Sequence, residues 1–105
     1  MNKSELIEGM VAKHPALPAH GVETAVNLVL DSITAELVRD GRVEIRGFGS
    51  FSARHRRARH GRNPKTGQAI DVPPKRVPFF IRGQELARRV DEGRLKYPIA
   101  PEAGG

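Results

Sequence analysis

Apolar residues recur at helical spacing over the first forty residues and predict two helices. The first begins after Asn2, whose side chain can cap the free backbone amides. It ends at His14, because a residue that precedes a proline is disfavoured in the helical region. The second helix runs from Pro18 to Gly41. Its apolar stripe is wider than one short helix can cover, so we expect part of it to pack against another subunit.

Beyond the second helix the apolar period changes to two, which is typical of a half-buried strand. Val43 and Ile45 alternate with charged residues, and Gly47-Phe48-Gly49 then marks a turn or a close backbone approach. A phosphate cradle is a weaker interpretation of this turn, because the P-loop lysine and the dinucleotide fingerprint are missing. The four phenylalanines lie at strand ends, which favours a place in the core over stacking on bases.

A projecting ribbon follows, made of two strands at 52–60 and 68–77. Arginines occupy both faces of the first of these strands, so neither face can be core. A last helix is predicted from Gln84 to Glu92. We therefore expect one domain over 1–94, with an arm at about 52–77 and a flexible tail over 95–105.

Positive charge is concentrated in the arm. Residues 54–82 carry nine cations and one acid, whereas the rest of the chain carries nine cations and eleven acids, so the net charge of +6 comes from this segment. A patch of one sign attracts a polyanion and binds it with release of counterions. Nucleic acid is therefore favoured over an acidic protein or an anionic membrane.

The tip of the arm has its own pattern. Asn63-Pro64 followed by Gly67 predicts a sharp turn at the far end of the ribbon. Arg62 and Lys65 flank the proline. A rigid apolar ring between two cations indicates a device for contacting DNA.

Composition limits the other possibilities. The chain has 105 residues, no Cys and no Trp, so its core is small, disulfides and thiolate metal sites are excluded, and oligomerisation is expected. The four histidines show no ligand spacing, and no paired carboxylates stand in an apolar context. We expect no metal, no cofactor, no membrane association and no enzymatic activity.

Two ordered motifs, Val43-Glu44-Ile45-Arg46-Gly47-Phe48-Gly49-Ser50-Phe51 and Gly61-Arg62-Asn63-Pro64-Lys65-Thr66-Gly67, resemble the integration host factor/HU family of bacterial DNA-bending proteins. Together with the start, Lys3-Ser4-Glu5-Leu6-Ile7-Glu8, they are most similar to its beta-type subunits. The resemblance covers residues 1 to about 94. It implies an α+β fold with two N-terminal helices, a three-stranded antiparallel sheet with a protruding β-ribbon arm, and a C-terminal helix, intertwined as a dimer.

The resemblance also implies the mechanism of proteins that bind the minor groove and insert an apolar side chain between base pairs. Two arms embrace the duplex in the minor groove, and Pro64 inserts between base pairs and kinks the DNA. Arg46, oriented by Glu44, is similar to a family pair associated with sequence preference. The DNA-contacting residues so implied are Lys3, Arg42, Glu44, Arg46, Arg54, Arg56, Arg57, Arg59, His60, Arg62, Asn63, Lys65, Lys75, Arg76 and Arg82.

The implied partners are double-stranded DNA and an alpha-type subunit of integration host factor in a heterodimer, or a second copy of the chain in a homodimer. The implied role is architectural: DNA bending that supports recombination, replication, transcription control and nucleoid organisation in the cytoplasm. One alternative is an HU-like homodimer that packages DNA without sequence preference. The other is a protein that binds RNA or single strands.

Overall fold

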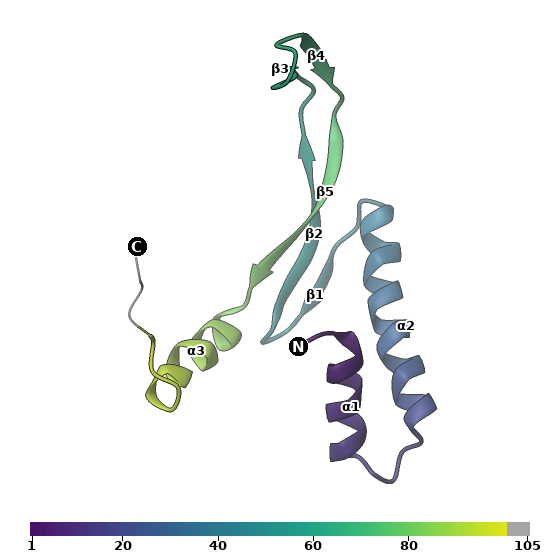
Figure 1. Cartoon of the computed structure of the whole chain (residues 1–105). Coiled ribbons are helices and arrows are strands. Elements are labelled where there is room, and N and C mark those ends of the chain that lie inside the picture. The colour runs from purple at the N-terminus through teal and green to yellow at the C-terminus, as the bar shows by residue number, and fades with distance from the viewer. Residues whose placement is uncertain (101–105) are drawn as a thin grey trace.

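Two helices form one end of the molecule and a long β-ribbon extends from the other in the computed structural model, which describes residues 1–100 (Figure 1). Helix α1 (Lys3–Lys13) packs beside α2 (Ala19–Val38). The Asn2 side-chain oxygen accepts a 2.9 Å hydrogen bond from the Glu5 amide, which confirms the predicted cap. Neither these helices nor any other within residues 1–100 is both long and apolar enough to cross a membrane.

Helix α2 ends earlier than Gly41, where the sequence predicted its end. Asp40 takes the left-handed conformation, with φ of 64°, that glycine usually supplies at a helix C-terminus. The Asp40 amide donates to the Leu37 carbonyl at 3.0 Å, and the Gly41 amide donates to the Glu36 carbonyl at 2.8 Å. A Cβ on Gly41 would displace the flexible Glu36 side chain, which lies against this glycine.

Three antiparallel strands form the sheet in the order β1 (Val43–Ile45), β2 (Gly49–Arg56) and β5 (Lys75–Arg82). The turn between β1 and β2 is closed by a 2.9 Å hydrogen bond from the Phe48 amide to the Ile45 carbonyl, which confirms the predicted turn. A Cβ on Gly49 would lie 2.5 Å from the Ile81 carbonyl oxygen, so the strands can approach only because this residue is glycine.

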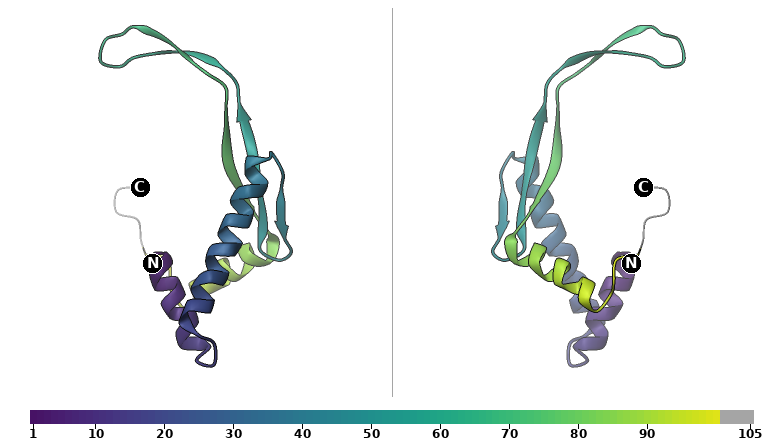
Figure 2. Two further views of the ribbon diagram at one scale, coloured as in Figure 1. Left: turned by 90° about the vertical axis from the view of Figure 1, so that its right-hand side faces the viewer. Right: turned by 90° about the vertical axis from the view of Figure 1, so that its left-hand side faces the viewer.

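The arm is bent, whereas the sequence predicted two unbroken strands (Figure 2). Pairing of β2 with β5 stops at Arg56 opposite Lys75 and resumes as β3 (Arg59–Arg62) with β4 (Ala69–Val72). The interruption places Pro73-Pro74 opposite two unpaired residues of the other strand. Two consecutive prolines supply no amide donors and fix φ, so the ladder cannot continue through them.

The predicted last helix is confirmed as α3 (Gln84–Glu92), and a short 3-10 helix, η1 (Gly93–Leu95), extends it. The expected tail over 95–105 therefore begins at the last residue of η1. Residues 96–100 contain no helix or strand, and residues 101–105 lie outside the described part of the chain.

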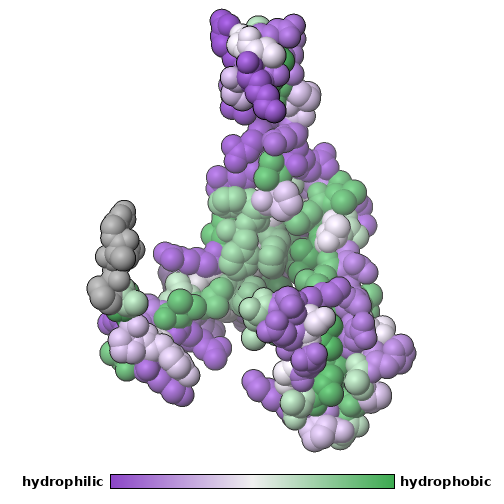
Figure 3. Space-filling model, viewed as in Figure 1, coloured by the Kyte–Doolittle hydropathy of each residue, from purple (hydrophilic) through white to green (hydrophobic). Residues whose placement is uncertain are grey.

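The chain has very little core of its own. Within residues 1–100, Val22 is the one buried hydrophobic side chain, 7% exposed. The Phe80 ring lies 4.8 Å from that of Phe51 and 5.5 Å from that of Phe48, between ring centroids. Hydrophobic side chains gather on the body, while hydrophilic side chains cover most of the arm (Figure 3).

Phe79 lies apart from the other three phenylalanines, although it is half-buried while Phe48 and Phe80 are 43% and 38% exposed. Consecutive strand residues point to opposite faces, and Phe80 occupies the face that carries Phe51. Phe79 therefore lies on the other face of the sheet, beneath the guanidinium of Arg54.

Candidate nucleic-acid interface

The tip of the arm is a hydrogen-bonded turn over residues 64–66. The Gly67 amide donates to the Asn63 carbonyl at 2.7 Å, and the Asn63 side-chain oxygen accepts from the Lys65 amide at 2.9 Å. Gly67 has φ of 70°, which only glycine adopts without strain. Pro64 is exposed in this turn, which joins β3 to β4. The end of the arm formed by β3 and β4 lies farthest from the helices (Figure 1).

The arm's cations divide between the two faces of the ribbon. Arg54, Arg56 and Lys75 point away from α2, because the intervening residues Ala53 and Arg76 line a hollow against that helix. Arg57 lies in the bend, Arg59 and Arg62 lie on β3, and Lys65 lies in the tip. The Arg62 side chain also donates to the Gly67 carbonyl at 3.0 Å.

Like charges face each other across the arm. Arg56 stands directly opposite Lys75, an arrangement that destabilises a strand pair in the absence of a counter-charge. Asp71 is the one acid of the distal ribbon, which is formed by β3 and β4. Its carboxylate lies 2.9 Å from Nδ1 of His60. Within residues 1–100, no ion pair forms with Arg54, Arg56, Arg57, Arg59, Arg62, Lys65, Lys75, Arg46 or Arg82. A surface with so many uncompensated cations attracts polyanions.

Arg76 was predicted from the sequence to line the DNA groove. In the structure it also contacts the body of the protein. Its Nη1 donates to the Val38 carbonyl at 2.7 Å, and its Nε lies 3.8 Å from the Asp40 carboxylate. His55 Nε2 lies 3.0 Å from the same carboxylate. These residues join the base of the arm to the end of α2.

The predicted orientation of Arg46 by Glu44 is also different in the structure. Glu44 forms its ion pair with Arg42, with 3.8 Å between Oε2 and Nη2. Arg46 lies in the turn after β1, where the chain leaves the strand and its alternation. Glu44, Arg46 and Arg82 still line one open hollow of about 570 Å³ at the end of the sheet.

Lys3 lies at the start of α1, apart from the arm, and its Nζ donates to the Asn27 side-chain oxygen at 2.9 Å. Because Asn27 is neutral, this contact positions Lys3 without cancelling its charge.

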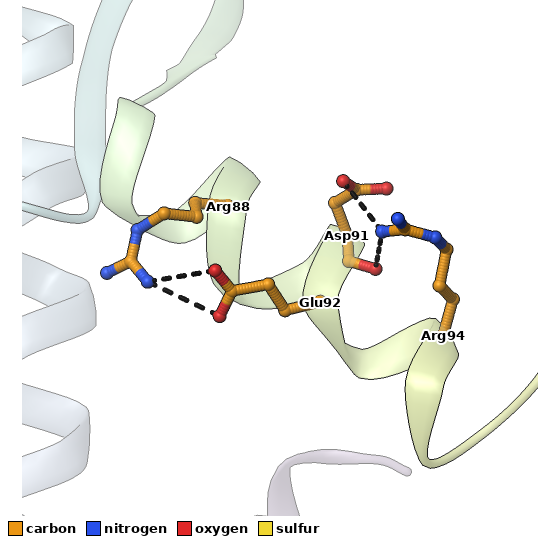
Figure 4. Close-up of polar contacts among 4 residues, drawn as sticks. All are labelled: Arg88, Asp91, Glu92 and Arg94. Atoms are coloured by element: carbon orange, nitrogen blue, oxygen red, sulfur yellow. Dashed lines mark hydrogen bonds and ion pairs between the residues drawn. The ribbon is translucent and has the colours of Figure 1, made fainter.

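Two arginines of the C-terminal segment, Arg88 and Arg94, are neutralised locally (Figure 4). Arg88 contacts both carboxylate oxygens of Glu92 at 3.2 and 3.3 Å. Arg94 contacts the Asp91 carboxylate at 2.9 Å and its carbonyl at 2.8 Å. The uncompensated positive surface therefore belongs mainly to the arm and the open end of the sheet.

Sequence reasoning did not predict the contact of Phe79 with Arg54 or the contacts of Asp40 with the base of the arm. The alternation of β5 could have placed Phe79 on the face of the arm cations. Nothing in the sequence pattern shows that Asp40 meets the arm, because that contact depends on where α2 ends. Among residues 1–100, no three His, Asp or Glu side chains are grouped closely enough to hold a metal ion.

Comparison with known proteins defines the class to which this interface belongs. The model of a family described as "Bacterial DNA-binding protein" matches residues 1–91. The chain belongs to this family, which comprises the integration host factor and HU proteins.

Within the family, the chain is similar to proteins named integration host factor subunit beta. The one from Dichelobacter nodosus is 54% identical over 92 residues, which are 88% of this chain and 96% of that protein. The one from Halorhodospira halophila is 50% identical over 99 residues, 94% of this chain and 97% of that protein. A solved Anabaena HU–DNA cocrystal structure matches with a TM-score of 0.78 and 33% identity, over 86% of this chain and 97% of that chain. The α+β fold implied by the sequence motifs is thereby confirmed.

Proposed function

We propose that this chain is an architectural DNA-binding subunit that bends duplex DNA. The observation that carries the proposal is the arm: a two-stranded basic ribbon that ends in an exposed proline turn. A two-stranded ribbon fits a groove of B-DNA. Support also comes from the match to an HU protein that was crystallised with DNA.

Pro64 is the proposed wedge. Its ring is apolar and rigid and has no N–H, so it can enter a base stack without burying an unsatisfied donor. Arg62 and Lys65 stand beside it to neutralise phosphates next to the opened step. The arm cations, Asn63 and His60 then follow the groove, while Lys3, Arg42 and Arg82 contact the backbone from the body. Glu44 would hold Arg42 in the free protein and act with Arg46 at the open end of the sheet.

A dimer is part of the proposal. The accessible surface is 9382 Å², against about 5800 Å² for a compact folded monomer of 11.5 kDa. Leu28 and Val29 on α2 are 65% and 56% exposed, which a stable monomer would avoid. A partner that covers α2 would bring a second arm to the other side of the duplex. Residues 1–94 would form the domain, with 95–105 as an appended tail.

The partner is an alpha-type subunit of integration host factor, because the named relatives are beta subunits. The resulting complex acts in the nucleoid of the cytoplasm, where a sharp bend brings distant DNA sites together for recombination, replication and transcription control. The match to the HU structure supports a second candidate function. In this candidate the chain forms a homodimer that packages DNA without sequence preference.

Energy transfer between dyes at the two ends of a duplex tests the bend. Addition of the protein, alone and co-expressed with an alpha-type chain, should raise the transfer, and an unlabelled single strand should compete poorly. Equal affinity for random and A-tract duplexes by a homodimer of measured mass would favour the HU-like candidate. Unchanged transfer at saturating protein would refute the proposed function.

A further inference from the structure

Arg54 lies flat against an aromatic ring on the open face of the sheet. Its guanidinium carbon is 3.4 Å from the centroid of the Phe79 ring. Phe79 is paired with Ser52, and Arg54 is paired with Val77, so the two side chains are diagonal neighbours across β2 and β5. Arg54 is exposed and Phe79 is half-buried, so the cation covers the outer side of the ring.

This stacking restricts a side chain that is otherwise costly to order. A free arginine samples many rotamers, and each immobilised side chain of this kind opposes binding through lost entropy. The ring face attracts the cation, while the N–H groups at the edge of the guanidinium point outward. Within residues 1–100, Arg54 takes part in no ion pair, so these donors remain available to a phosphate.

We propose that Phe79 is a positioning residue that holds Arg54 ready for a phosphate of the DNA backbone where the arm leaves the sheet. The inference rests on the proposed function, since it takes duplex DNA as the ligand. Phe79 acts through Arg54 and does not itself contact DNA. Its contribution is to fix the guanidinium before binding, so that less freedom is lost when the phosphate arrives.

A double-mutant cycle on duplex affinity tests this role, with Phe79→Leu, Arg54→Leu and the double variant. Phe79→Leu should weaken binding about two- to fivefold, the range expected for an exposed cation–π contact. It should leave the salt slope unchanged, because the Arg54 charge remains. Arg54→Leu should reduce the magnitude of that slope by about 0.9. In the Arg54→Leu background, Phe79→Leu should have no further effect, and Phe79→Tyr should bind like the wild type.

Proton NMR of the free protein distinguishes the contact with Arg54 from a general packing role of Phe79, which would not change the chemical shifts of Arg54. The Arg54 side-chain protons should be shifted upfield by the Phe79 ring, and the shift should persist in Phe79→Tyr and disappear in Phe79→Leu. If Phe79→Leu fails to fold, the Phe79→Tyr shift and affinity still test the contact.

Two results would overturn the inference: an equal loss of affinity from Phe79→Leu with and without Arg54, or Arg54 protons without a ring shift. Either could occur while the wild type still bends duplex DNA, in which case the proposed function stands. If the wild-type protein shows the ring shift but does not bend the duplex, the proposed function is refuted and the contact between Arg54 and Phe79 is not.

Discussion

Arg76 Nη1 donates a 2.7 Å hydrogen bond to the carbonyl oxygen of Val38, the last residue of α2. A cation at this end of a helix also interacts favourably with the partial negative charge of the terminal carbonyls. Asp40 and His55 complete the contact on the same side of the sheet. The base of the arm is therefore tied to the body, whereas the side-chain hydrogen bonds and ion pair of the part beyond the bend, within residues 1–100, all stay within the arm.

Arg76→Ala should lower the free energy of unfolding by about 1 kcal/mol, because it removes a charged hydrogen bond at a partly exposed position. Lys75→Ala is the matched control. It removes a neighbouring cation that points to the opposite face, and it should change stability by less than about 0.5 kcal/mol. Urea unfolding followed by circular dichroism measures both. Equal losses in the two variants would show that the contact with Val38 adds nothing.

Pro64→Ala should reduce DNA bending more than DNA affinity. The variant keeps the arm cations but loses the rigid ring that is proposed to open the base stack. Energy transfer between dye-labelled duplex ends measures the bend, and a mobility shift measures the affinity. Gln68→Ala, at the same tip but without the ring, should bend DNA like the wild type. A normal bend by Pro64→Ala would remove the wedge from the mechanism.

Gly67→Ala should impair bending by straining the tip. The left-handed conformation costs a non-glycine residue roughly 1–2 kcal/mol, and the cost is purely conformational here, since a Cβ would meet nothing within 4 Å. Gly93→Ala is the control, because it also meets nothing within 4 Å but has helical backbone angles. Energy transfer should fall for the first variant only. Similar transfer by both would show that the tip tolerates strain.

The salt dependence of binding should separate arm cations from paired cations. Each neutralised phosphate contributes a log–log slope of about −0.9 on B-DNA, so Arg56→Gln should reduce the magnitude of the slope by about that amount. Arg88→Gln removes the same charge from a residue already paired with Glu92, and it should leave the slope unchanged. Fluorescence anisotropy titrations over a range of salt measure both slopes. A smaller slope for Arg88→Gln would extend the binding surface to α3.

The sequence pattern predicted most of the fold because the signals for these elements are local. The Asn2 cap, the strand at Val43–Ile45 and the extent of α3 each depend on neighbours along the chain, and each is confirmed. The tip turn was predictable for the same reason, since Asn-Pro and a following glycine act over a few residues.

The errors concern relationships between distant residues. The two arm strands were expected to be continuous. Pro73-Pro74 lies in one strand but interrupts the pairing of both, because a break in one strand removes the partners of the other. Phe79 was expected in the core because of its place at a strand end, but its face is determined by the register of β5. The contact of Arg76 with Val38 was not predicted, because it depends on where α2 ends. Hydrophobicity and charge can be read from the residue type, whereas the strand register determines which other residues a side chain contacts.

Leu28→Asp should prevent assembly of the proposed dimer. Leu28 is 65% exposed on α2, and a partner that covers this helix would bury an unpaired carboxylate in the variant, which is strongly unfavourable. Because the chain buries so few side chains alone, loss of the partner should also lower the melting temperature. Leu17→Asp is the matched control, since Leu17 is similarly exposed, at 54%, but precedes α2. Light scattering should report a dimer for the wild type and for Leu17→Asp, and a monomer or unfolded chain for Leu28→Asp. A folded dimer of Leu28→Asp would place the subunit interface elsewhere than on this face of α2.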